Sequence, residues 1–163
     1  MNANTDRIEK QVLLKVPRER IWRALADAKQ FGTWFGVRFD APFAEGARVT
    51  GRITPTEVDA EVAEMQKPHE GTPFEWVVEK IEPMQRITFQ WHPFAVDKGV
   101  DYGSEPKTRI VFELHDAPDG ILLTVTESGF EALPPTRREE ALAANDDGWA
   151  HQMMLIAKYL VQQ

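Results

Sequence analysis

Leu133-Pro-Pro-Thr-Arg-Arg-Glu-Glu140, continued to Ala157-Lys-Tyr-Leu-Val-Gln-Gln163, is the part of this sequence that decides the fold. The two prolines end whatever precedes them. Thr136, with Glu139 three residues later, forms a capping box, so the stretch predicts a helix that begins here. About 26 residues at about 1.5 Å each give a rod of about 40 Å, which is the width of a small domain.

The predicted helix has one broad apolar face. Spacings of three and four bring together Leu142, Asn145, Trp149, Met153, Ile156 and Leu160. Met154, Ala157 and Val161 widen this face. A helix of this kind is stable only when it covers an apolar surface, so the rest of the chain is expected to supply a sheet.

Composition narrows the class of protein. The 163 residues are 42% hydrophobic and 28% charged, which is typical of one water-soluble domain spanning 1–163. The net charge of −7 argues against nucleic acid as a partner. Without cysteine there is no disulfide, thiolate nucleophile or cysteine-held iron–sulfur cluster. A polar start and the lack of a long apolar run predict no signal peptide, no membrane span and a cytoplasmic location.

Two short helices are expected directly after a first strand. Residues 7–16 alternate between apolar and polar side chains as a half-buried strand does, and Pro17 ends them. Pro17 also suits the first position of a helix, so residues 17–27 predict a short amphipathic helix. Residues 28–35 predict a second one, which carries Trp34 and Phe35.

Short antiparallel strands fill the middle of the chain. Alternation and turn residues predict strands at 37–39, 47–53, 74–81, 86–91, 110–114 and 121–125. Residues 54–72 give no clear prediction, and residues 94–106 predict a long loop. The fold class is therefore α+β, with a curved antiparallel sheet of six to seven strands wrapped around the long C-terminal helix.

Large apolar side chains from both partners are expected to face a shared interior. The strands and the long helix contribute Trp76, Phe89, Trp91, Phe112, Trp149 and Met153, and Trp34 and Phe35 close one end. Such a set either fills a core or lines a hollow. Gly148 favours a hollow, because glycine inside a helix costs about 1 kcal/mol relative to alanine and calls for a packing reason.

Polar candidates are few, and each has a structural alternative. Glu127 points inward if the last strand keeps its alternation, and Arg52, Arg86 or Arg109 is expected to pair with it. Glu127 then either forms a structural ion pair or acts as a catalytic acid. Asn145 faces the sheet, where it binds a ligand or makes a structural hydrogen bond. His92 ends a strand as either a surface or a functional histidine.

No catalytic constellation stands out. The four histidines show no metal-ligand spacing, and no phosphate-binding or nucleophile motif occurs. No metal or cofactor is therefore expected.

Two groups of residues resemble a known family. The first comprises Leu13-Leu-Lys-Val-Pro-Arg-Glu-Arg-Ile-Trp-Arg-Ala-Leu25 and Phe31-Gly-Thr-Trp-Phe35. The second comprises Glu127-Ser-Gly-Phe-Glu-Ala-Leu-Pro-Pro135, Asn145-Asp-Asp-Gly-Trp149 and Leu155-Ile-Ala-Lys-Tyr-Leu160. Together they are similar to the START-like (SRPBCC) superfamily, the helix-grip fold of the birch pollen allergen. Within it, the AHSA-like group, named for the activator of the Hsp90 ATPase, is the nearest resemblance.

This resemblance implies a cavity between sheet and helix that in relatives holds lipids, hormones, polyketides or other apolar molecules. Its cavity-facing positions here are Trp76, Phe89, Trp91, Phe112, Trp149 and Met153, with an entrance near Phe35 and the 94–106 loop.

Three functions follow as hypotheses. The first is binding of a small apolar molecule. The alternative is an interaction domain with a chaperone partner, active in the stress response. The third is a cyclase or hydrolase type of enzyme, with Glu127, His92, or Asp101 and Tyr102 as acid–base groups. The ligand and the oligomeric state stay open, with a homodimer as one alternative.

Overall fold

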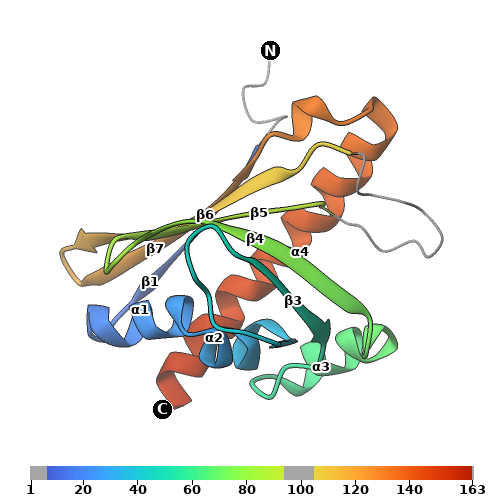
Figure 1. Cartoon of the computed structure of the whole chain (residues 1–163). Coiled ribbons are helices and arrows are strands. Elements are labelled where there is room, and N and C mark those ends of the chain that lie inside the picture. Colours follow the sequence, from blue (N-terminus) through green and yellow to red (C-terminus); the bar gives the residue numbers. More distant parts are fainter. Residues whose placement is uncertain (1–6, 94–104, 163) are drawn as a thin grey trace.

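The computed structural model describes residues 7–93 and 105–162. All of the strands belong to one antiparallel seven-stranded sheet in the order β1-β7-β6-β5-β4-β3-β2 (Figure 1). They are β1 (Arg7–Leu14), β2 (Val37–Phe39), β3 (Arg48–Ile53), β4 (Pro73–Glu82), β5 (Arg86–Trp91), β6 (Thr108–Ala117) and β7 (Gly120–Ser128). The sheet curves, and this confirms the α+β helix-grip prediction.

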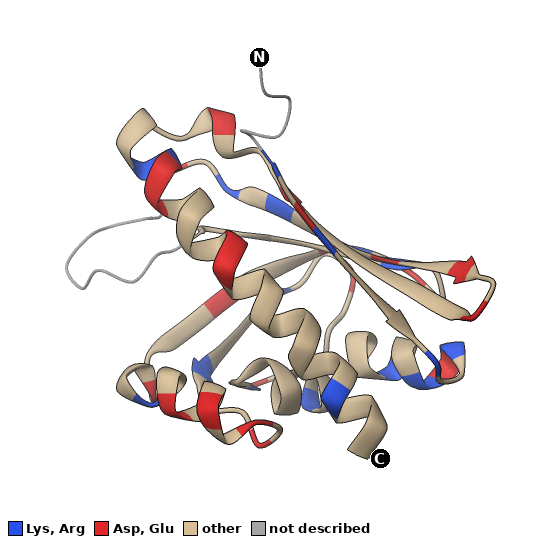
Figure 2. Ribbon diagram, turned by 180° about the vertical axis from the view of Figure 1, so that it is seen from behind, with Lys and Arg blue, Asp and Glu red and all other residues tan. Residues whose placement is uncertain are grey.

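The helices gather on one side of this sheet. They are α1 (Arg18–Ala26), α2 (Ala28–Phe35), α3 (Ala60–Gln66) and α4 (Pro135–Gln162), with the short 3₁₀ turns η1 (Lys67–His69) and η3 (Phe130–Ala132). Seen from behind, α4 runs diagonally across the sheet (Figure 2). It packs against β1, α1 and α2, so the rod and the sheet enclose the core between them.

Helix α4 carries the apolar face that its spacing predicts. Trp149, Met153 and Ile156 are all buried. The helix begins at Pro135, one residue before Thr136, so the predicted capping box does not form its start. Proline suits this first position because its missing N–H has no helical partner there. Val161 was assigned to the apolar face wrongly; it is 80% exposed, because Tyr159 and Leu160 take the buried positions of the last turn.

The segment that gave no prediction, residues 54–72, contains α3 and η1. Asp59 begins α3 by accepting a hydrogen bond from the Val62 backbone N–H at 2.9 Å, a standard N-cap contact. The strands at 37–39 and 86–91 have the predicted bounds, and the last hairpin is longer at both ends than predicted. That extension brings Thr108 into β6.

The end of α2 is fixed to two other helices. Gly36 ends α2 with a φ of 99°, a left-handed conformation that glycine adopts without strain. The carbonyl of the preceding residue, Phe35, accepts hydrogen bonds from Gln66 of α3 at 3.2 Å and from Gln152 of α4 at 3.1 Å. This junction holds the backbone of Phe35 against α4.

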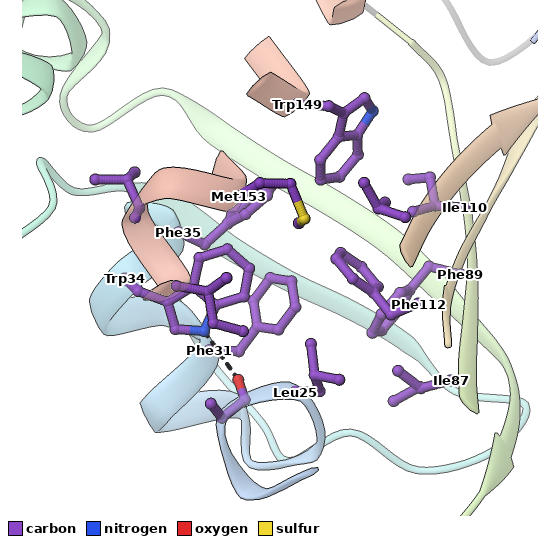
Figure 3. Packing of buried hydrophobic residues seen from close by; sticks show 14 of the residues in the cluster. Leu25, Phe31, Trp34, Phe35, Ile87, Phe89, Ile110, Phe112, Trp149 and Met153 are labelled. Carbon is purple, nitrogen blue, oxygen red and sulfur yellow. Dashed lines mark hydrogen bonds between the residues drawn. The ribbon is translucent and has the colours of Figure 1, made fainter. Parts of the chain in front are cut away.

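Aromatic side chains dominate the core (Figure 3). Rings from α2, β4, β5, β6 and α4 meet between the sheet and the helices. The largest side chains that are almost fully buried include Trp34, Trp76, Phe31, Phe89 and Phe112. The indole of Trp34 donates to the Ala24 carbonyl at 2.9 Å, which ties α2 to α1.

Candidate functional site

The inward aromatic residues touch one another. Their ring centroids lie between 3.9 and 6.5 Å apart, and Trp76 stacks on Phe89 at the shortest of these distances, with an angle of 14° between the planes. Trp149 contacts Phe112 at 5.7 Å. These residues therefore form one continuous aromatic cluster between β4, β5, β6 and α4.

Four of these rings form a closed circuit, which we call the aromatic rim. It consists of Phe35, Phe74, Trp91 and Trp149, from α2, β4, β5 and α4. Neighbouring members lie 5.9, 5.9, 5.8 and 6.1 Å apart around the circuit. Trp76 contacts three of the four at 5.2 to 5.9 Å. Trp76 is 1% exposed, whereas Phe74 and Trp91 are half-buried, so these two rings are the part of the rim nearest to solvent.

Glu127 is buried at one side of the rim and accepts four hydrogen bonds. Its Oε1 accepts from Asn145 Nδ2 at 2.9 Å and from Trp149 Nε1 at 2.8 Å. Its Oε2 accepts from Trp91 Nε1 at 2.7 Å and from Thr108 Oγ1 at 2.5 Å. We call these five residues the Glu127 clamp. A carboxylate offers about four acceptor positions, so all of them are occupied.

Strand register and helix spacing together build the clamp. Trp91 of β5 pairs directly with Thr108 of β6, and Glu127 of β7 pairs with Ile110, two residues along β6. From the other side, Asn145 and Trp149 are four residues apart on α4 and therefore share a face. The clamp thus joins three strands to the helix.

The predicted arginine partner of Glu127 is wrong. Arg86 pairs with Glu82 and Glu113, Arg109 pairs with Glu79, and Arg52 donates to the Gly71 carbonyl. A cation is not needed, because four neutral donors compensate the buried carboxyl group.

Within residues 7–93 and 105–162, two buried side-chain polar atoms have no hydrogen-bond partner. One is the indole Nε1 of Trp76, and the other is Oε1 of Gln152, whose amide nitrogen binds the Phe35 carbonyl. The core is otherwise well paired, since the indoles of Trp34, Trp91 and Trp149 all donate. The unpaired indole of Trp76 lies directly under the aromatic rim.

The remaining candidates lie apart from these contacts. Nε2 of His92 is 3.1 Å from the Glu105 carbonyl oxygen, and no described contact joins it to Glu127. Asp101 and Tyr102, with most of the predicted 94–106 loop, lie outside the described residues. Among the described residues, no group of three His, Asp or Glu side chains has a metal-binding arrangement.

The hollows of the structure lie outside the aromatic cluster. The described residues line two hollows of about 480 Å³ each, one beside Lys107 and Ser128 and the other beside Arg18 and His115. Neither is lined by Phe, Trp or Tyr.

Within residues 7–93 and 105–162, no helix has the length and apolar character needed to cross a membrane.

Gly148 has open space where a side chain would begin. A Cβ placed on it meets no described atom within 4 Å, so close packing does not explain this glycine. It lies between Asn145 and Trp149, the two helix residues of the clamp.

Charged side chains outside the core have ordinary partners. Gln90 and Arg109 hydrogen-bond to Glu79 and lower the pKa of its carboxyl group. Lys158 of α4, followed by the Val62 backbone N–H, lowers the pKa of Asp59. The ion pair between Lys158 and Asp59, at 2.6 Å, also links the start of α3 to α4.

Comparison with known families places the chain. Residues 15–161 match the family described as Activator of Hsp90 ATPase homolog 1-like protein. The chain belongs to this family. Because the match spans nearly the whole sequence, it confirms the AHSA-like resemblance. No curated protein matches the chain.

Solved structures share the fold of this family member. A protein from Mesorhizobium loti, MLL2253, is 20% identical and covers 96% of this chain and 98% of its own, with a TM-score of 0.69. A protein from Arthrobacter aurescens is 14% identical over 100% of this chain and 90% of its own, at 0.71. DynU16, from the dynemicin biosynthetic locus, is 23% identical over 95% of this chain, at 0.66; our chain spans 47% of its length. At these identities, the likeness shows the fold alone.

Proposed function

We propose that this AHSA1-like protein binds a small apolar molecule between the sheet and α4, against Trp76 and under the aromatic rim. The observation that carries the proposal is the cluster of touching aromatic rings that the sheet and the helices contribute, with one buried indole N–H left unpaired. Apolar pockets with a few well-placed polar groups are typical of small-molecule sites. The family and its helix-grip fold fit such a role.

In this proposal the residues divide by role. Trp76, Phe89, Phe112 and Met153 form the walls, and Phe35, Phe74, Trp91 and Trp149 form the rim. Glu127 and Asn145 position the two rim tryptophans, since every acceptor position of Glu127 is already occupied. Trp34 supports the far wall, with its own N–H bound to Ala24.

Entry of a ligand requires rings to move, because the rings now touch one another. The rim has a fixed half and a loose half. Trp91 and Trp149 are held by hydrogen bonds to Glu127 at 2.7 and 2.8 Å. The side chains of Phe35 and Phe74 have no polar atom, so only apolar contacts hold these two rings in place. We therefore propose that Phe74, the more exposed of the two, moves aside first.

Titration with the uncharged fluorescent probe N-phenyl-1-naphthylamine tests this function. We expect saturable binding at one site, with a change in tryptophan fluorescence because three indoles adjoin the site. Phe74→Ala should raise the association rate several-fold in stopped-flow measurements, because it opens the loose half of the rim.

The matched control is Leu13→Ala, a truncation of a 41%-exposed residue on β1, away from the rim. It should leave the association rate unchanged. The proposal fails if a panel of uncharged aromatic probes gives no saturable binding, or if both variants behave alike.

The other hypotheses keep their status as predictions. A chaperone partner, a stress-response role, a homodimer and a cytoplasmic location are untested by the fold and the family match. An acid–base role for Glu127 requires one of its four donors to leave first, so a binding role suits its present contacts better.

A further inference from the structure

We infer that the hollow beside Lys107 and Ser128 binds the phosphate group of a small soluble molecule. We call it the Lys107 hollow; its volume is about 480 Å³. It lies on the face of the sheet that the helices leave uncovered, away from the aromatic cluster. The inference therefore goes beyond the proposed function and does not depend on it.

Strand register builds the floor of the Lys107 hollow. Four of its lining residues pair directly in one row across the sheet, in the order Arg7 of β1, Ser128 of β7, Arg109 of β6 and Gln90 of β5. Directly paired side chains point to the same face of a sheet, and neighbours along a strand point to opposite faces. Phe89 and Ile110, the neighbours of Gln90 and Arg109, are buried in the core, so the row faces outward.

The Lys107 hollow is rich in positive charge, although the whole chain carries a net charge of −7. Arg7, Arg109 and Lys107 line it, against one carboxylate, Glu131. The two arginines flank Ser128 from both neighbouring strands. Cationic groups placed together repel one another, and an anion bound between them offsets that repulsion.

The cations keep donors that a ligand can use. Nε of Arg109 donates to Glu79 at 2.8 Å, which orients the guanidinium group and occupies one of its five N–H donors. Arg7 has only a 3.4 Å contact with Glu9, between two side chains that are about half exposed. Among the described residues, none forms a hydrogen bond or an ion pair with the side chain of Lys107 or Ser128.

The hollow beside Arg18 and His115 has the same volume and a different charge balance. Its two arginines are paired with carboxylates that line the same hollow: Arg18 with Asp116 at 2.7 Å, and Arg86 with Glu113 at 3.3 Å. Charge, not size, is thus what distinguishes the Lys107 hollow as an anion site.

The kinds of donor in the Lys107 hollow suit a phosphate group. The planar fork of arginine and the point charge of lysine both bind phosphate oxygens, and a hydroxyl group such as that of Ser128 donates to a further one. The volume lies within the range of small-molecule sites, so the phosphate can carry a small organic group. A soluble ester is favoured over an anionic membrane, because a bilayer of that charge repels a protein with a net charge of −7.

Glycerol 3-phosphate and glycerol form a matched pair of probes that differ in one phosphate group. In isothermal titration calorimetry at low salt, we expect glycerol 3-phosphate to bind saturably at one site, with a dissociation constant of about 1 mM or lower, and glycerol not to bind. Added salt should weaken this binding, because it screens exposed charges. Binding should be tighter above about pH 6, where the phosphate gains its second negative charge.

Two substitutions in the Lys107 hollow should change this affinity in opposite directions. Lys107→Gln removes an attractive charge and should weaken binding about threefold, whereas Glu131→Gln removes a repulsive one and should strengthen it about threefold. Lys15→Gln and Glu64→Gln are the matched controls: they change the net charge by the same amounts, far from the hollow, and should leave binding unchanged. All four side chains are exposed, so these variants should fold.

Amide chemical shifts locate the site on the unmodified protein, and the largest changes should fall on Ser128 and Gly129. Shifts confined to other residues, no saturable binding of glycerol 3-phosphate, or equal effects of the hollow variants and their controls would overturn the inference. Phosphatidylcholine vesicles with phosphatidic acid present the same phosphate monoester on a membrane. Binding to these vesicles without binding to glycerol 3-phosphate would exclude the soluble ligand. None of these results changes the expected binding of uncharged aromatic probes, so the proposed function stands or fails separately.

Discussion

Two buried polar groups beside the aromatic rim differ in how they are paired. Glu127 is 0% exposed and accepts hydrogen bonds from four donors. Trp76 is 1% exposed and its N–H has no acceptor. Burial is nearly the same, so pairing is what distinguishes the two regions.

This difference separates structural from binding roles. A carboxyl group with every acceptor position filled has nothing left to offer a ligand, but it orients two indoles and ties β7 to α4. An unpaired donor contributes little to the empty protein and gains most when an acceptor arrives. The residue that looks most like a catalytic acid in the sequence is thus the less available of the two.

Removing the clamp should have the largest effect on stability. Glu127→Leu leaves four buried donors without an acceptor, and each costs about 1 to 3 kcal/mol. Allowing for relaxation of Thr108 and Asn145, we expect the free energy of unfolding to fall by at least about 4 kcal/mol. Glu127→Gln should cost about half as much, because one amide oxygen still accepts. Urea unfolding followed by circular dichroism measures both.

Glu113→Gln is the matched control on the neighbouring strand. Glu113 pairs with Arg86 at the sheet surface, where both side chains are partly exposed, so the loss should stay below about 1 kcal/mol. A loss below about 1 kcal/mol for Glu127→Leu as well would contradict the clamp.

Two identical substitutions compare the regions directly. Trp149→Phe and Trp76→Phe remove the same volume from nearly equally buried positions. Only the first also breaks a hydrogen bond to a carboxylate, worth about 1.5 to 3 kcal/mol. We expect Trp149→Phe to lower the free energy of unfolding more, by about 2 kcal/mol.

Thr108→Val supplies the control for this pair, because it removes a donor to Glu127 with almost no change in volume. Its cost should resemble the difference between the two tryptophan variants. Equal losses for Trp149→Phe and Trp76→Phe would show that pairing does not distinguish the two regions.

Much of the fold is readable from local patterns. Alternation places β5 and β7, Pro17 marks the start of α1, Gly36 marks the end of α2, and spacings of three and four define the buried face of α4. Residues 54–72 gave no prediction because α3 has only seven residues and little apolar periodicity, although Asp59 is a good N-cap residue. Short helices of this kind depend on packing more than on propensity.

The site was predicted in parts but not as an assembly. Alternation put Glu127 inward and helix spacing put Asn145 and Trp149 toward the sheet, and the structure brings the three together. Thr108 was missed because the predicted strand began two residues later; extending the alternation of Ile110 backward finds it. The prediction that an arginine pairs with Glu127 was wrong. Charge balance suggests a cation beside a buried carboxyl group, but it does not show that four neutral donors can take that place.

The unpaired indole of Trp76 lies beyond any reading of the sequence. Pattern alone shows that Trp76 faces inward, as it does. Whether its N–H meets an acceptor depends on every side chain around it, and the rings among these come from α2, β2, β4, β5 and the connection between β2 and β3. A missing partner is a property of the assembled core.

Substitution of Gly148 should have the smallest effect on stability, and it tests the helix turn that carries the clamp. It lies between two clamp residues of α4, and a Cβ there meets no described atom, so Gly148→Ala should raise the free energy of unfolding by about 1 kcal/mol through helix propensity. Gly46 is the matched control: its Cβ is equally unobstructed, but its φ of 86° makes alanine unfavourable by about 1 to 2 kcal/mol. Urea unfolding should therefore give shifts of opposite sign.

If Gly148→Ala stabilises the protein and also slows probe binding, flexibility of the helix turn at Gly148 helps Trp149 to move when a ligand enters. A destabilised Gly148→Ala would instead mean that a close contact, not propensity, explains this position.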